Sequence, residues 1–197
     1  MEEKSISTEE KIKAAARTIF TRKGYAATKT RDIAEEAGMN LALLNYYFRS
    51  KEKLFSIVMA ENLKKLFGIL APTLNDKSKS LDEKIAYIAT SYIDMLFLNP
   101  DLPLFVLSEL RQNPVWLRET LNVDAYVIGS HFMQQLQEKK KDINPIHFLM
   151  SFLGMLIFPF AARPILQGTA ALTDEQYNQL MEERKKLIPI WLKCMLE

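Results

Sequence analysis

Five cations of the sequence lie at the starts of two predicted helices, where a positive charge is unusual. They are Lys29 and Arg31, which flank Thr30, and Arg49, Lys51 and Lys53, which surround Ser50. A helix N-terminus carries a partial positive charge, so cations there destabilise an isolated helix. A bound phosphate reverses this effect, because backbone N–H groups, hydroxyls and cations then face one anion. The pattern predicts phosphate contacts at both starts, and a solvated charged turn is the alternative.

The segment between these starts carries side chains that could read base edges. In a helix over residues 41–48, one face holds Asn45, Tyr46 and parts of Leu41 and Ala42. An Asn amide can bond N6 and N7 of adenine, and small apolar groups can contact the methyl group of thymine. A Tyr hydroxyl can reach a phosphate. This face is therefore predicted to meet DNA.

The opposite face of the same helix is predicted to be buried. Leu44 and Phe48 lie one turn apart and form its core pair. The neighbouring residues Tyr46 and Tyr47 could also pack against the protein. We expect one of these two tyrosines to be partly in the core.

Two short helices separated by Gly38 must position these residues. The first is predicted from the apolar stripe of Ile33, Ala34 and Ala37, and the second has Asn40 as its N-cap. Both fit within about twenty residues, which is the size of a helix-turn-helix, whose second helix enters the major groove of DNA. A longer helix precedes them, with an apolar stripe of Ile12, Ala15, Ala16, Ile19 and Phe20.

Two runs of this sequence resemble the DNA-binding domain of TetR/AcrR-type transcriptional regulators. They are GYAATKTRDIAEEAGMN at residues 24–40 and LNYYFRSKEKLF at residues 44–55. The resemblance covers roughly residues 8–60, and its glycine, alanine, Tyr-Phe and Ser-Lys-Glu positions fall in register. The rest of the chain is similar only in being a helical domain of suitable length.

The resemblance implies DNA-binding roles for the matching positions. The candidates are Lys29, Thr30, Arg31, Asn40, Leu41, Ala42, Asn45, Tyr46, Tyr47 and Lys51. Thr30 and Lys51 would contact phosphates, Arg31 a base or a phosphate, and Tyr47 the DNA backbone. Leu41, Ala42, Asn45 and Tyr46 would approach base edges. Many members have a polar residue in place of Leu41, so its contact should be apolar.

Helical periodicity accounts for nearly all of the remaining sequence, and no alternating pattern lasts long enough to predict a strand. A long helix capped by Ser50 is predicted to end at Pro72. We therefore predict an all-α protein. Residues 1–50 would form a three-helix helix-turn-helix DNA-binding domain, joined by the long helix to a helical bundle at residues 51–197. The resemblance implies that this bundle binds an effector and forms the dimer.

Two predicted helices near the end of the sequence favour a homodimer. The helix from Asn144 to Ala162 is apolar almost all round, and the helix from Thr173 to Met195 adds a second broad apolar face. A four-helix interface between two copies would bury both faces. The alternative is that both helices belong to the core of one chain. A dimer would bind a near-palindromic double-stranded DNA operator, with recognition helices about 34–36 Å apart or a multiple of that distance.

A small, apolar effector is the other partner that the resemblance implies. The candidate effector-binding residues are Tyr92, Met95, Phe97, Phe105, Trp116, Phe132, Met133, Phe152 and Met155. The nine methionines of the chain favour an adaptable interior. The same residues could instead simply fill the core.

Patterns typical of catalysis and metal binding are absent from the sequence. His131 and His147 lie in different predicted helices without metal-ligand spacing, and the single cysteine, Cys194, excludes an intrachain disulfide. We therefore predict a protein that is not an enzyme and needs no cofactor or metal. The net charge is +2, divided into +4 for residues 1–68 and −2 for the remainder. A helical adaptor whose basic N-terminal domain binds an acidic protein is thus the alternative function.

Signals for export or membrane insertion are not found. The apolar run over residues 148–162 is shorter than the roughly 20 residues of a membrane span. The polar first residues lack the apolar segment of a signal peptide. We predict a buried helix over this run, no membrane partner and a cytoplasmic location.

Overall fold

The computed structural model describes residues 7–112, 114–122, 124–142 and 144–197, and the side chains of residues 110, 116, 117, 120, 121, 124 and 125 lie outside this description. Helices follow one another through this part of the chain, and none of it forms a strand. They are α1 (Thr8–Ala27), α2 (Thr30–Glu36), α3 (Leu41–Phe48), α4 (Lys51–Asn75), α5 (Leu81–Leu98), α6 (Leu102–Gln112), α7 (Pro114–Leu121), the π-helical turn η1 (Asp124–Ile128), α8 (His131–Lys139), α9 (Pro145–Ala161), α10 (Arg163–Ala170) and α11 (Asp174–Leu196). The predicted all-α fold is confirmed.

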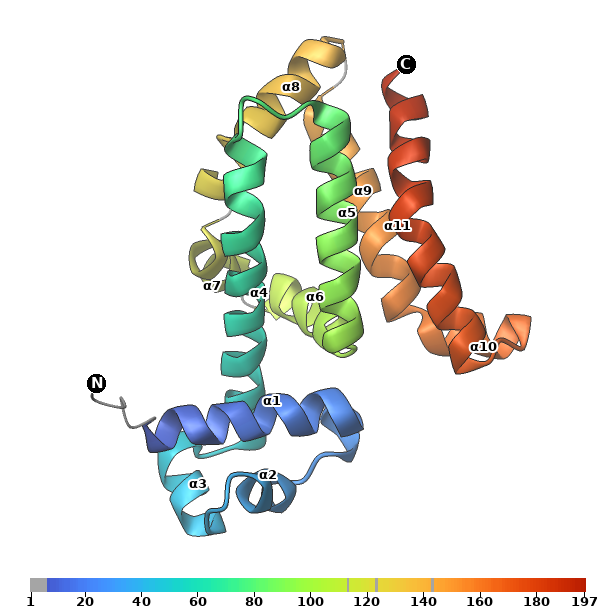
Figure 1. The fold of residues 1–197 in the computed structure, drawn as a ribbon. Coiled ribbons are helices and arrows are strands. Elements are labelled where there is room, and N and C mark those ends of the chain that lie inside the picture. The colour runs from blue at the N-terminus through green and yellow to red at the C-terminus, as the bar shows by residue number, and fades with distance from the viewer. Residues whose placement is uncertain (1–6, 113, 123, 143) are drawn as a thin grey trace, which may run out of the picture.

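The first three helices form a small unit across the start of α4 (Figure 1). Within it α1 packs against both α2 and α4. Ser7, Asn40 and Ser50 each accept a backbone N–H from the first turn of α1, α3 and α4, respectively. These bonds satisfy donors that every helix leaves free at its start. The predicted caps Asn40 and Ser50 are confirmed, and they define where α3 and α4 begin.

The helix α4 is 25 residues long and joins this unit to the bundle formed by the later helices. The prediction that it ends at Pro72 was wrong, because the helix continues to Asn75. Proline removes one hydrogen bond, to the carbonyl of Gly68 four residues earlier. This loss lies close to the helix end, where few further bonds depend on it. The carbonyl of Leu74, which has no partner within the helix, accepts a hydrogen bond from Lys84.

Lys84 of α5 is a fully buried cation at the far end of α4. Its Nζ donates to the carbonyl of Leu74 at 3.1 Å and lies 2.9 Å from Nδ1 of His131 in α8. Burial lowers the pKa of Lys84, whereas the partial negative charge of the helix end favours its charged form. The lysine thereby fastens three helices at one point.

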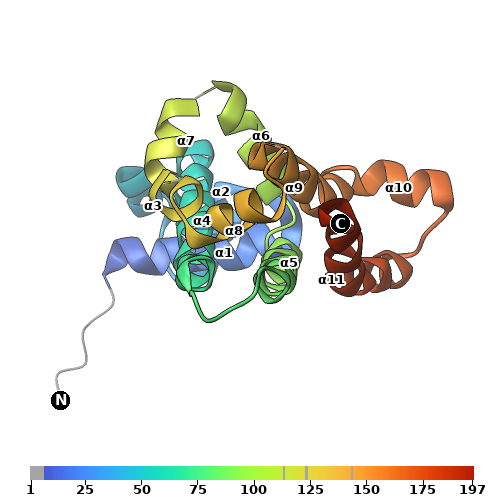
Figure 2. The same cartoon turned by 90° about the horizontal axis from the view of Figure 1, so that it is seen from above.

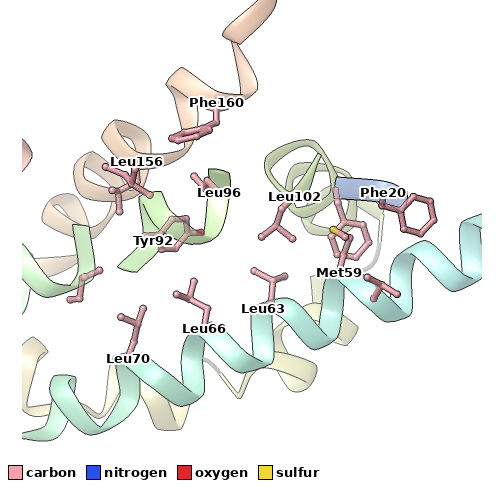
Figure 3. Packing of buried hydrophobic residues seen from close by; sticks show 14 of the residues in the cluster. Phe20, Met59, Leu63, Leu66, Leu70, Tyr92, Leu96, Leu102, Leu156 and Phe160 are labelled. Atoms are coloured by element: carbon pink, nitrogen blue, oxygen red, sulfur yellow. The ribbon is translucent and has the colours of Figure 1, made fainter. Parts of the chain in front are cut away.

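The remaining helices form a bundle around α5. Figure 1 shows α5 beside α4, with α11 along its other flank, and these pairs are in contact. Figure 3 shows buried apolar side chains on one face of α4 directed at α5 and, toward Met59, at Leu102 and Phe20, with the side chains of α9 beyond α5. Those labelled from the three helices are Met59, Leu63, Leu66, Leu70, Tyr92, Leu96, Leu156 and Phe160.

The short helix α10 was not predicted. It projects from the side of the bundle, as the view from above shows (Figure 2), and none of its residues is buried. Among the described helices, no single one is long and apolar enough to cross a membrane. Only α9 and α10 taken together meet these two criteria, and they are bent by 66° relative to each other.

Candidate functional site

The turn between α2 and α3 sets the direction of the second helix. Gly38 has a φ of 65°, a left-handed conformation that glycine adopts without strain. The N–H of Met39 donates to the carbonyl of Ala34 at 2.9 Å. Ile33 of α2 and Leu44 of α3 are fully buried behind the turn. The buried face of α3 is therefore fixed, and its opposite face is directed outward.

The outward face of α3 carries the residues predicted for base contacts. Ala42 and Asn45 are exposed and Leu41 is half-buried. Tyr46 is 79% exposed and Tyr47 41% exposed. The expectation that one tyrosine lies partly in the core was wrong, because positions 44 and 48 already fill the buried face. The two rings instead meet edge to face on the surface, with centroids 5.4 Å apart.

Asn40 combines two predicted roles. Its Oδ1 accepts the N–H of Leu43 at 2.8 Å and caps α3. Its amide NH2 group donates to no other described residue. The cap therefore leaves the two donors of this side chain available at the exposed end of the helix.

Three predicted contacts lie together at the start of α2. Lys29 and Arg31 are exposed, and Thr30 is half-buried. The carboxylate of Asp32 in the same helix bonds this start: its Oδ2 accepts the N–H of Lys29 at 2.9 Å and lies 3.2 Å from Nζ of Lys23. The bond from Lys29 and the charge of Lys23 lower the pKa of Asp32. No described carboxylate pairs with the side chains of Lys29 or Arg31, so both cations are available to an anion.

Lys51, at the start of α4, is turned toward the protein. Its Nζ donates to the carbonyls of Tyr25 and Thr28, at 3.0 Å each, and lies 4.2 Å from the centre of the Tyr25 ring. An ammonium group has three N–H donors, so one is left for a phosphate. Lys51 thus holds the end of α1 and the loop that follows it, a role that the sequence did not reveal.

Arg49 connects α3 to α4 in a strained backbone conformation. Its φ is 57° and its ψ −39°, a combination that residues with a Cβ atom rarely adopt. Its N–H donates to the carbonyl of Asn45 at 2.9 Å. The side chain is exposed and pairs with no carboxylate among the described residues. The described residues therefore give this cation no partner of opposite charge.

Tyr25 joins the start of α2 to the larger unit, although the sequence gave no chemical reason to select it. Its N–H donates to Oδ2 of Asp101, between α5 and α6, at 2.5 Å. Its hydroxyl donates to Oε1 of Glu52 at 3.0 Å, and its ring lies 4.5 Å from that of Phe55. Gly24 was the available signal, because its φ of 74° is a left-handed conformation that favours a residue without a side chain.

The predicted effector residues come together in the core of the bundle. Tyr92, Phe105, Phe132, Met133 and Phe152 are buried, Met95, Phe97 and Met155 are half-buried, and the side chain of Trp116 lies outside the described residues. Burial raises the pKa of Tyr92 to about 12, so its hydroxyl stays neutral. Two cavities in the described part open near α8, and of these candidates only Met133 lines either one. Contact with an effector stays a prediction.

The helices α9 and α11 each expose an apolar stripe. The stripe of α9 consists of Ile146, Met150, Leu153 and Phe158, and that of α11 of Leu180, Leu187, Ile190, Trp191 and Met195. Their opposite faces are buried in the bundle, at Phe152 and Leu156 of α9 and at Ile188 and Leu192 of α11. Each helix therefore has a second apolar face that the described part of the chain leaves uncovered.

The side chains that could do redox or metal chemistry are scattered. His131 is bonded to Lys84, His147 is exposed at the start of α9, and Cys194 is an exposed free thiol on α11. Within the described residues, no three His, Cys, Asp or Glu side chains come together as a metal site.

Known proteins share both the N-terminal motif and the fold. Residues 12–58 match the family described as bacterial regulatory proteins, tetR family. The HTH-type transcriptional regulator YttP of Bacillus subtilis is 23% identical over 201 residues, covering 96% of this chain and 94% of that protein. The HTH-type transcriptional repressor KstR2 of Mycolicibacterium smegmatis is 30% identical over 86 residues, 44% of this chain and 42% of that protein. The structure of FadR from Bacillus subtilis in complex with stearoyl-CoA has a TM-score of 0.60 and 18% identity, covering 90% of this chain and 96% of that chain.

Proposed function

The chain belongs to the TetR/AcrR family of transcriptional regulators, and we propose that it is a homodimeric repressor that an effector releases from its DNA operator. The outward face of α3 carries this proposal. There Asn45 and Tyr46 are exposed above the buried Leu44, beside a helix start where Lys29 and Arg31 are unpaired. Apart from the ring contact of Tyr46 with Tyr47, these side chains form no hydrogen bond or ion pair with the described residues, whereas the major groove and its phosphates offer a partner for each.

The contacts divide into backbone and base contacts. Lys29, Thr30 and Arg31 bind phosphates from the start of α2, with Arg31 also within reach of a base. Lys51 adds a phosphate contact through its third donor, and Tyr47 adds a backbone contact. Base edges are read from α3, by the amide of Asn40, the apolar groups of Leu41 and Ala42, the amide of Asn45 and the ring of Tyr46.

The second half of the proposal concerns the division of labour along the chain. Residues 1–50 bind DNA, and residues 51–197 bind the effector and form the dimer. The uncovered stripes of α9 and α11 support this, because a second copy would bury both of them in a four-helix interface. The two recognition helices would then lie about 34–36 Å apart, or a multiple of that, on a near-palindromic operator in the cytoplasm.

Release by the effector is a shift between two arrangements of the dimer. An apolar effector is supported by the apolar interior of the bundle and by the stearoyl-CoA in the structure of FadR. The route to DNA would run through α4 and through the hydrogen bond that the N–H of Tyr25 donates to Asp101. Tyr25 lies three residues before Thr28, at the entrance to α2. Movement of the turn between α5 and α6 would therefore pull on the DNA-binding unit directly.

Selection from a random pool of duplex oligonucleotides tests the proposal. We expect the purified protein to enrich a near-palindromic site and to lose affinity steeply as salt increases, because several phosphates are bound. Asn45→Ala should relax the preference at one base step, at a loss of about 1–3 kcal/mol for the preferred base. Asn178→Ala, on the exposed surface of α11, is the matched control. A protein that enriches no sequence would overturn the proposal in favour of an adaptor.

A further inference from the structure

Two cavities open at the end of the bundle opposite the DNA-binding unit. One of about 210 Å³ lies between the end of α8, the start of α9 and the end of α11, at the top of the view in Figure 1. Its apolar wall is formed by Leu136, Phe148, Met195 and Leu196. A wider cavity of about 550 Å³ adjoins it at Asn144 and Pro145. Neither cavity reaches the surfaces assigned to DNA.

Lys140 brings a positive charge to the smaller cavity. It is half-buried and lines the cavity together with His147. Among the described residues, no carboxylate pairs with Lys140 or with its neighbours Lys139 and Lys141. The partial negative charge at the end of α8 favours a lysine at this position. It does not explain why the lysine also lines a cavity with an apolar wall. An apolar slot with one unpaired cation at its edge fits a ligand with an aliphatic chain and an anionic end.

Phe148 is shared between this cavity and the predicted effector residues. Its ring lines the cavity, and it also packs against the rings of Phe132 and Phe152, whose centroids lie 6.4 Å and 6.0 Å away. The cavity of about 210 Å³ is smaller than the roughly 300–1,000 Å³ of typical ligand sites. A long chain can therefore enter only if the side chain of Phe148 turns aside and opens a path toward the aromatic core.

We propose that the effector is an aliphatic chain with an anionic end group, that Lys140 binds the anion, and that Phe148 is the gate through which the chain enters the core. This inference rests on the proposed function, because it names the effector of the regulator. The anionic end is a carboxylate in a free fatty acid and a phosphate group in an acyl thioester of coenzyme A. Both groups offer a negative charge to pair with Lys140, so the two ligand sources need separate measurements.

Calorimetric titration of the full chain separates these cases. The ligands are saturated carboxylates of six to sixteen carbons below their micelle concentration, the alcohols of the same length, and the corresponding acyl-CoA esters. We expect the anionic ligands to bind about tenfold or more tighter than the alcohols, the value of a hydrogen bond to a charged group. Lys140→Met should abolish that difference, whereas Lys139→Met, at an exposed lysine that lines neither cavity, should keep it. A dependence on Lys140 for only one ligand class identifies the source of the anion.

Variants of Phe148 test the gate. Phe148→Leu keeps an apolar side chain in the wall and should speed association of the longest chains, while Phe148→Trp should restrict binding to the shortest. Thermal unfolding identifies any variant that fails to fold, and the Lys140 variants then decide the proposal. Equal affinities for carboxylates, acyl-CoA esters and alcohols, or unchanged binding by Lys140→Met, would overturn the proposal. In that case, retained operator selection would leave the proposed function standing, whereas its loss would refute that function separately.

Discussion

The starts of α2 and α4 have the same pattern of cations around a hydroxyl, yet their cations do different things. At α2, the side chains of Lys29 and Arg31 pair with no described carboxylate, and Asp32 bonds the helix start from within. At α4, Lys51 is bonded to the carbonyls of Tyr25 and Thr28. A cation at a helix start can thus either await a ligand or hold a neighbouring loop. Variants at the two starts should separate DNA binding from stability.

The largest effect is expected for Lys51→Met. The carbonyls of Tyr25, at the end of α1, and of Thr28, in the loop that follows, lose this donor, so the free energy of unfolding should fall by about 1–3 kcal/mol. Affinity for every DNA sequence should fall as well, because this loop positions the start of α2. Denaturant titration and binding to a selected operator measure the two effects. Lys53→Met, at an exposed position of the same turn, should leave stability nearly unchanged, and equal stability of both variants would contradict the inward role of Lys51.

At the start of α2, substitutions are expected to weaken DNA binding while leaving stability nearly unchanged. Lys29→Ala and Arg31→Ala should each change the free energy of unfolding by less than about 0.5 kcal/mol. Each should lower the slope of log affinity against log salt by about one, the loss of one phosphate contact. Binding isotherms at four salt concentrations measure the slope. A wild-type slope in both variants would remove this helix start from the DNA interface.

Arg49→Gly should produce effects of opposite sign on stability and binding. Glycine adopts a positive φ without strain, so the variant should unfold with a free energy about 1 kcal/mol higher. The salt slope should fall by about one if the guanidinium reaches a phosphate. Calorimetric unfolding and DNA titration of the same preparation test both. A destabilised Arg49→Gly would mean that this backbone conformation carries no strain.

The smallest effect concerns the acids at the two helix starts. The bond from Lys29 N–H holds the pKa of Asp32 below its usual value, and hydrogen bonds from backbone N–H and from Tyr25 do the same for Glu52. A carboxylate with a lowered pKa stabilises the fold above its unfolded pKa of about 4, and this contribution is lost as the pH falls through its folded pKa. Asp32→Asn and Glu52→Gln should therefore flatten the decline of the melting temperature between pH 5 and pH 2. A decline as steep as in the wild type would contradict the assigned shifts.

The sequence predicted most of the fold because local signals decide it. The core pair of α3, Leu44 and Phe48, followed from helical spacing, and the caps Asn40 and Ser50 from their hydroxyl and amide groups. The end of α4 did not follow from the local rule for proline. The helix α4 runs past Pro72 to an end where Lys84 supplies a hydrogen bond from another helix.

The site was predictable only where exposure follows from helical geometry. Asn45 and Tyr46 had to lie opposite the buried pair of α3, and they do. The inward turn of Lys51 and the bond from Tyr25 to Asp101 depend on segments 23 or more residues apart, which periodicity does not describe. Likewise, an apolar stripe through Tyr92 predicts burial but cannot tell a packed core from a ligand site.

The length of α4 has a geometric consequence for the dimer. Its 25 residues span about 37 Å at 1.5 Å per residue, with Lys51 bonded at one end and Leu74 held by Lys84 near the other. A tilt of about 5° about the upper end would swing the lower end by about 3 Å along so long an arm. Two-fold symmetry would double this to about 6 Å between the DNA-binding units, nearly two base-pair steps of 3.4 Å. An effector that reorients this helix by only a few degrees would thus carry the two units out of phase with successive major grooves.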